Sequence, residues 1–115
     1  MIKRMSKRPW GNYRILLHQP GIQVKRIEIK KGCRFSLQKH FKRAEKWIVI
    51  SGRGLATLGT QTLCVKPGSF LNVPKGCIHR LQSTGTASLI LIEVQFGKYL
   101  GEDDILRLAD DFGRL

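Results

Sequence analysis

Four residues have types and spacings that suit one metal ion. Gln38 and His40 lie two residues apart, and Glu45 follows after a four-residue turn. Residues two apart on a β-strand face the same side of the sheet, so Gln38 and His40 can reach one ion, and Glu45 at the start of the next strand can face them. His79 follows a turn at residues 74–76 and supplies a fourth ligand.

The chemistry of this set is that of a divalent first-row metal. An amide oxygen, two imidazoles and a carboxylate form a mixed nitrogen and oxygen site, with coordination positions left for water or substrate. Zinc is the first candidate, and manganese, iron, cobalt and nickel suit the same ligands. Each residue taken singly is more often a surface or hydrogen-bonded structural residue, so the prediction depends on the spacing.

The elements that must position these residues are short strands. Runs of β-branched and aromatic residues, separated by glycine and proline, predict an all-β domain. Turn-forming residues lie between the runs, so we expect consecutive strands to pair antiparallel. The tail, residues 102–111, is compatible with a helical turn. The expected strands cover residues 13–18, 23–29, 35–40, 45–51, 54–58, 61–65, 69–73, 78–83 and 88–96.

Composition sets the scale of the fold. A chain of 115 residues, 42% hydrophobic, fits one domain over residues 1–115, and we expect residues 1–8 to be a flexible or edge-covering arm. The cysteines Cys33, Cys64 and Cys77 are odd in number and lack CxxC spacing, which predicts a reduced, cytoplasmic protein. The apolar runs are too short for a membrane span.

The formal net charge of +13 raises the hypothesis of a nucleic-acid ligand. However, the basic residues are spread over residues 2–8, 25–34 and 39–46, without a zinc-finger, RNP-type or basic-zipper pattern. A smaller anion such as a sugar phosphate would use the same positive field. Nucleic acid is therefore the weaker alternative.

The spacing of the four residues resembles the two cupin motifs. Gln38 stands where the first motif usually has histidine, and Ser83 stands where the second has asparagine. The resemblance implies a cupin barrel, that is, a double-stranded β-helix or jelly-roll. The first motif falls on Gly32, Gln38, His40, Glu45 and Gly52, and the second on Gly68, Pro74, Gly76 and His79.

The set of glutamine, histidine, glutamate and histidine resembles the zinc site of mannose-6-phosphate isomerases. The similarity to their type II domain includes Trp47 and residues 8–11, 23–26, 36–38, 43–45, 51–52, 79–81, 91–95 and 97–104. In that family the domain often forms the C-terminal end of a mannose-1-phosphate guanylyltransferase, a part that these residues do not include. The resemblance implies a metal-dependent aldose–ketose isomerase that interconverts mannose 6-phosphate and fructose 6-phosphate, both phosphorylated hexoses.

Such a reaction needs a proton-transferring base and basic side chains that bind the phosphate. Glu93 lies inside an apolar run, so it is either paired with a basic neighbour such as Arg26 or acts as the base. Gln95, two residues on, can bond substrate hydroxyls, and Trp47 is either core or a sugar-stacking platform. The candidates for the phosphate are Arg43, Arg80 and Lys25 or Arg26. Arg80 also adjoins the ligand His79, and it is, with Glu93, a candidate catalytic residue.

A non-catalytic reading remains open. A metal-holding cupin that binds a sugar phosphate or sugar nucleotide would carry the same ligands without an accessible base. In either case we expect a homodimer, because barrels of this size associate through edge strands or an exposed apolar face.

Overall fold

The computed structural model describes residues 5–115, and these residues form strands and turns without a helix. Consequently no helix in this range is long and apolar enough to cross a membrane. The strands are β1 (Met5–Arg8), β2 (Gly11–Gln19), β3 (Ile22–Ile29), β4 (Leu37–Lys39), β5 (Arg43–Ser51), β6 (Gly54–Leu58), β7 (Gln61–Val65), β8 (Phe70–Val73), β9 (His79–Ser83), β10 (Leu89–Gly97) and β11 (Leu106–Ala109).

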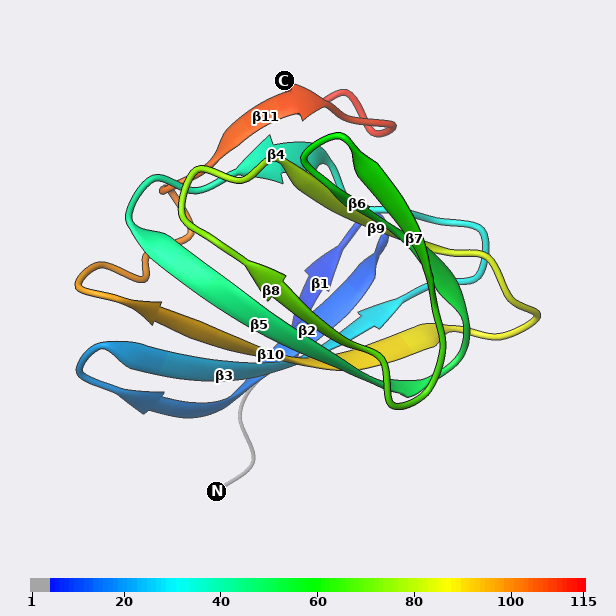
Figure 1. Cartoon of the computed structure of the whole chain (residues 1–115), viewed down its shortest axis with the longest axis horizontal. Coiled ribbons are helices and arrows are strands. Elements are labelled where there is room, and N and C mark those ends of the chain that lie inside the picture. Colours follow the sequence, from blue (N-terminus) through cyan, green and yellow to red (C-terminus); the bar gives the residue numbers. More distant parts are fainter. Residues whose placement is uncertain (1–4) are drawn as a thin grey trace.

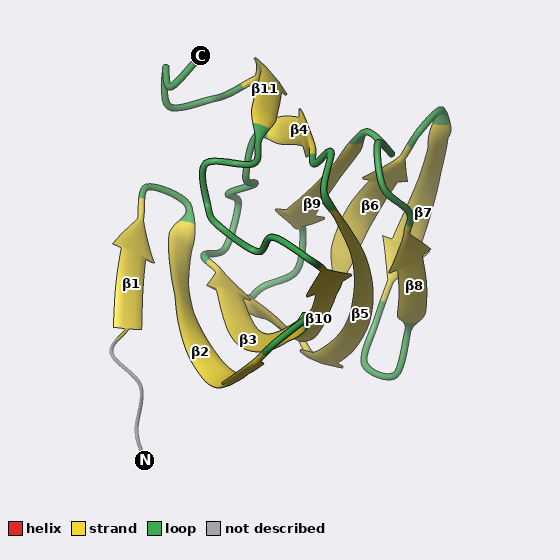
Figure 2. Ribbon diagram, turned by 90° about the vertical axis from the view of Figure 1, so that its left-hand side faces the viewer, coloured by secondary structure: helices red, strands yellow, loops and turns green. Residues whose placement is uncertain are grey.

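The strands form two antiparallel sheets that enclose a barrel interior (Figures 1 and 2). One sheet has the order β1-β2-β3-β10-β5-β8 and the other the order β11-β4-β9-β6-β7. This arrangement confirms the all-β cupin prediction. The expected pairing of consecutive strands is wrong for most of the chain, since among the described strands only β1–β2, β2–β3 and β6–β7 pair in that way. Elsewhere the connection carries the chain to the opposite sheet.

The tail differs from its prediction. Instead of a helical turn within residues 102–111, residues 106–109 form β11, which pairs with β4. Without β11, the strand β4 would be a sheet edge with open backbone groups, and pairing with β11 satisfies them. At the other end, β1 pairs with β2 along the edge of the larger sheet, while residues 1–4 lie outside the described residues.

The apolar core fills one part of the interior. Trp47 is fully buried, and Phe35 packs edge-on against the rings of Trp10 and Trp47 with centroids 5.8 and 6.1 Å apart. Phe35 also meets the ring of His79 at 6.3 Å, so the core borders directly on the predicted metal ligands. The rest of the interior is lined by buried polar side chains, which include Gln23, Lys25, Arg43, Glu45, Glu93 and Gln95.

Candidate metal centre

The strands β4, β5 and β9 position the four predicted ligands inside the barrel. Gln38 lies in β4 and pairs in register with His79, the first residue of β9. His40 directly follows β4, and Glu45 is the third residue of β5 rather than its first. Alternation of side chains along each strand turns all of these residues inward.

Two turns before these strands depend on glycine. Gly32 has a φ of 77° and Gly76 a φ of 74°, in the left-handed region that residues with a Cβ rarely adopt. These turns set the chain direction just before the segments that carry Gln38 and His79. The glycines of the two motifs are therefore explained by backbone geometry.

The imidazoles and the carboxylate converge within the buried interior. His40, Glu45 and His79 each offer a ligand atom within 4.8 Å of the others, and their side chains are 1–3% exposed. His40 Nε2 lies 3.3 Å from Glu45 Oε2, and His79 Nε2 lies 3.8 Å from Glu45 Oε1. The cluster can hold a metal ion.

Hydrogen bonds behind the imidazoles fix their tautomers. His40 Nδ1 donates to the carbonyl of Asp104 at 2.6 Å, and His79 Nδ1 donates to the carbonyl of Cys77 at 2.9 Å. Because a carbonyl only accepts, each Nδ1 carries the proton and each Nε2 presents a lone pair to the cluster. Burial, followed by the charge of Arg43, lowers the pKa of His40 to about 4, and burial also lowers the pKa of His79. Neutral imidazoles of this kind suit a metal.

Hydrogen-bond donors surround the same lone pairs. Arg43 donates through Nη2 to His40 Nε2 at 3.1 Å and through Nε to Glu45 Oε2 at 2.9 Å. Gln38 Nε2 lies 3.3 and 3.5 Å from the Nε2 atoms of His40 and His79. The Ser36 hydroxyl donates to Gln38 Oε1 at 2.6 Å, and it can equally accept from the amide nitrogen, so a half-turn of the amide is compatible with Gln38 as an oxygen ligand. The amide oxygen of Gln38, the two imidazoles and the Glu45 carboxylate are therefore ligands that suit a divalent cation.

Glu93 lies beside this cluster, inside the barrel. It is 5% exposed, and Gln95 Nε2 donates to its Oε1 at 2.5 Å. Gln23 Nε2 in turn donates to Gln95 Oε1 at 3.1 Å, which fixes the orientation of the Gln95 amide. Burial, together with the charge of Glu45, raises the pKa of Glu93 to about 7. Its carboxylate can therefore exchange a proton near neutral pH.

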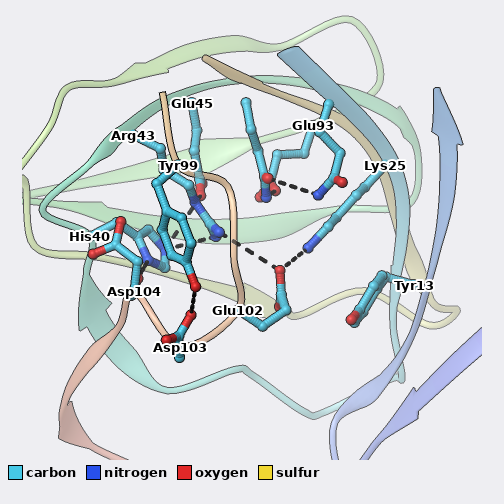
Figure 3. A network of polar contacts seen from close by, with 12 residues as sticks. Tyr13, Lys25, His40, Arg43, Glu45, Glu93, Tyr99, Glu102, Asp103 and Asp104 are labelled. Carbon is cyan, nitrogen blue, oxygen red and sulfur yellow. Dashed lines mark hydrogen bonds and ion pairs between the residues drawn. The ribbon is translucent and has the colours of Figure 1, made fainter. Parts of the chain in front are cut away.

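A cavity of about 90 Å³ adjoins the cluster and is lined by two of the four predicted ligands, Gln38 and His40. Gln38, His40 and Glu93 line its inner part, and Glu102 lies toward the mouth between Lys25 and Arg43 (Figure 3). Lys25 Nζ is 2.5 Å from Glu102 Oε2, and Arg43 Nη1 is 3.7 Å from the same oxygen.

The structure does not bring every predicted residue to this cavity. Arg26 lies on the outer side of β3 and pairs with Glu28 at 3.4 Å, because Lys25 takes the inward position. Glu93 thus has Lys25, and not Arg26, as its partner across the strands. Arg80 donates to the carbonyls of Phe35 and Ala109. It therefore faces away from His79.

Trp47 and Gln95 have supporting positions. Trp47 is fully buried and donates through Nε1 to Glu45 Oε1 at 3.0 Å, so it orients a ligand from within the core. Gln95 uses both amide atoms inside the barrel, on Gln23 and Glu93.

Two residues of the tail were missed by sequence reasoning. The carboxylate of Asp104 accepts the N–H groups of Phe41 and Lys42 at 3.0 and 2.9 Å, while its carbonyl orients His40. Glu102 pairs with Lys25. Both belong to residues 97–104. This segment resembles the type II isomerase domain, but its sequence pattern did not indicate a role for any single residue.

Comparison with known proteins agrees with the motif spacing. Residues 1–110 match the family described as the mannose-6-phosphate isomerase C-terminal domain. The chain is 48% identical over 111 residues to the xanthan biosynthesis protein XanB of Xanthomonas campestris, covering 96% of this chain and 24% of that protein. It is 46% identical over 107 residues to the alginate biosynthesis protein AlgA of Pseudomonas aeruginosa, covering 93% and 22%.

A mannose-1-phosphate guanylyltransferase of Sinorhizobium fredii is 41% identical over 104 residues, which covers 90% of this chain and 20% of that protein. The chain thus spans a fifth to a quarter of the length of these relatives. Among solved structures, oxalate decarboxylase of Bacillus subtilis superposes with a TM-score of 0.82 at 18% identity, over 92% of this chain and 30% of that one. The capsular polysaccharide assembling protein CapF of Staphylococcus aureus gives a TM-score of 0.78 at 18% identity, over 93% and 34%. Both share the fold.

Proposed function

We propose that this chain, which belongs to the mannose-6-phosphate isomerase C-terminal domain family, is a metal-dependent aldose–ketose isomerase that interconverts mannose 6-phosphate and fructose 6-phosphate. The observation that carries the proposal is the position of a buried carboxylate, Glu93, which lies beside the His40–Glu45–His79 cluster and shares one basic cavity with Gln38 and His40. Each of these features supports one requirement of the reaction.

The metal would be held by Gln38, His40, Glu45 and His79, with zinc as our first assignment from the mixed nitrogen and oxygen donors. A divalent ion there would supply a Lewis acid for negative charge that develops on the substrate oxygens. Trp47 and Arg43 hold the Glu45 carboxylate through hydrogen bonds to its two oxygens. The Asp104 and Cys77 carbonyls hold the imidazoles.

Glu93 is the proposed base. Isomerisation moves one proton between C2 and C1 of the open-chain sugar through an enediol, while a hydroxyl proton passes between O2 and O1. One carboxylate can carry the carbon-bound proton, because it can accept the proton from one carbon and return it to the other. A pKa raised to about 7 allows Glu93 to be ionised or protonated near neutral pH. The hydrogen bond from Gln95 holds one of its oxygens in place.

The test is an isomerase assay on metal-loaded protein with mannose 6-phosphate, following the formation of fructose 6-phosphate. Glu93→Gln should lower kcat by at least about 100-fold because a positioned base contributes on that order, with metal content unchanged. A Gln38→Ala, His79→Ala double variant should lose both metal and turnover. Arg26→Gln, on the outer side of β3, serves as the matched control and should keep both.

The second candidate is a metal-holding cupin that binds a sugar phosphate or sugar nucleotide without converting it. The observation that favours it is the name of some relatives, which are guanylyltransferases matched over only a fifth of their length. Stoichiometric metal and saturable binding of mannose 6-phosphate, without turnover in the wild-type chain, would support this candidate and exclude the isomerase for that substrate.

We also propose a homodimer formed through the outer face of the larger sheet. Ile48, Ile50, Phe70 and Phe96 are 38–56% exposed on this face. A two-fold contact sets the same surface of two copies against itself. Because the chain has a net charge of +13, two copies repel each other least where apolar side chains predominate on that surface.

A further inference from the structure

The Glu102 carboxylate lies across the mouth of the cavity, between two cations that belong to the barrel interior. The side chains of Lys25 and Arg43 are 4% and 5% exposed, whereas that of Glu102 is 48% exposed. Figure 3 shows both cations pointing toward the carboxylate from either side. Burial opposes ionisation of Glu102, but the charges of Lys25 and Arg43 outweigh it and lower the pKa of the carboxyl group. Glu102 is therefore an anion at neutral pH.

This carboxylate leaves the cationic site incompletely paired. Arg43 donates through Nε and Nη2 to Glu45 and His40, whereas its buried Nη1 has no hydrogen-bond partner and lies 3.7 Å from the Glu102 carboxylate. Three further arginines, Arg8, Arg107 and Arg114, line the same cavity. An isolated buried N–H of a charged group is costly, so an anion whose oxygens reach both this N–H and Lys25 would suit the site better than the Glu102 carboxylate does.

A phosphate monoester has that chemistry. It presents three acceptor oxygens and up to two negative charges, and it bonds strongly to arginine and lysine. It and the Glu102 carboxylate cannot occupy the space between Lys25 and Arg43 together, because like charges in contact repel.

The local structure allows Glu102 to leave. Asp104 anchors the segment through the N–H groups of Phe41 and Lys42, and Asp103 is held by the Tyr99 hydroxyl. The Glu102 side chain is half exposed, so rotation about its own bonds takes the carboxylate into solvent while these anchors remain.

We infer that Lys25 and Arg43 form a phosphate subsite and that Glu102 is a built-in competitor for it, which a phosphorylated ligand displaces. The choice of a sugar phosphate as the ligand of this subsite rests on the proposed function. A neutral sugar has no anionic group that could replace the Glu102 carboxylate beside Lys25 and Arg43. Glu102 therefore favours phosphate monoesters over neutral sugars.

The experiment is calorimetric titration of the full chain, at one fixed metal content, with inorganic phosphate, mannose 6-phosphate and mannose. Glu102→Gln removes the competing charge and keeps the side-chain size, so the Kd for both phosphates should fall by about tenfold, the scale of one charge contact. Asp103→Asn makes the same change of charge one residue away and should leave both Kd values within about twofold. Lys25→Met should weaken both phosphates by more than tenfold. Mannose should bind no better to any variant.

Equal affinities of Glu102→Gln and Asp103→Asn, or weaker phosphate binding by Glu102→Gln than by the wild type, would overturn the inference. The readout is binding, so it is independent of turnover. An inactive chain with the expected gain in phosphate affinity would remove the isomerase proposal and leave the subsite in place. An active chain without that gain would do the reverse.

Discussion

At the scale of single residues, the site depends on which atom of each side chain is already engaged. The Nδ1 atoms of His40 and His79 are committed to backbone carbonyls, which turns both Nε2 lone pairs toward the cluster, where that of His40 accepts from Arg43. Arg43 orients Glu45 with Nε and leaves Nη1 without a hydrogen-bond partner. The same guanidinium therefore connects the candidate metal centre with the phosphate subsite.

Glu93 provides a prediction at this scale. Its pKa is raised to about 7 from 4.5, so its contribution to stability is fully present below pH 4.5 and is lost as the pH rises through 7. Metal-free Glu93→Gln should match the wild type near pH 4.5 and exceed it at pH 8, by on the order of 3 kcal/mol. Chemical denaturation at several pH values measures this; a difference that is the same at every pH would contradict the assignment.

At the scale of elements, the short strand β4 is placed by its neighbours. It has three residues, and it is held by β9 on one side and β11 on the other. Arg107 in β11 and His79 in β9 are both register partners of Gln38. The segment between β10 and β11 then brings Asp104 against the turn that follows His40. The tail therefore forms part of the site through Asp104.

Asp104→Ala tests this role of the tail. Loss of the carboxylate leaves the N–H groups of Phe41 and Lys42 without partners, which should cost about 1–3 kcal/mol of unfolding free energy. Metal affinity should fall about tenfold, because the carbonyl that orients His40 loses its anchor. Denaturation and metal titration measure the two effects. Asp103→Asn, whose amide oxygen can still accept from the Tyr99 hydroxyl, is the control, and equal metal affinities of the two variants would refute the coupling.

At the scale of the whole molecule, most of the charge lies on the outside of the barrel. The interior cations Lys25 and Arg43 are matched by Glu45, Glu93 and Glu102, so most of the net charge of +13 lies outside the barrel. The outer face of the larger sheet carries exposed apolar residues beside charged ones, with Ile48 and Phe70 as register partners and Lys46 over the Phe70 ring. The dimer prediction belongs to this face.

Phe70→Lys tests the homodimer. A two-fold contact would place two new ammonium groups close together, so the variant should be monomeric where the wild type has twice the chain mass by light scattering. Leu63→Lys makes the same change on β7 of the other sheet, and it should remain dimeric. A wild-type chain of single mass at the concentrations of the assay would exclude the homodimer.

The sequence by itself determined the family, the all-β fold and the inward set of Gln38, His40, Glu45 and His79. These depend on local rules: side chains alternate along strands, and glycines such as Gly32 and Gly76 permit turns that other residues resist. Only the tertiary structure decided that Lys25 rather than Arg26 faces the cavity, that β11 joins β4, and that Glu102 meets Lys25 across 77 residues of sequence. Contacts between distant segments follow from strand order and register, which local periodicity does not encode.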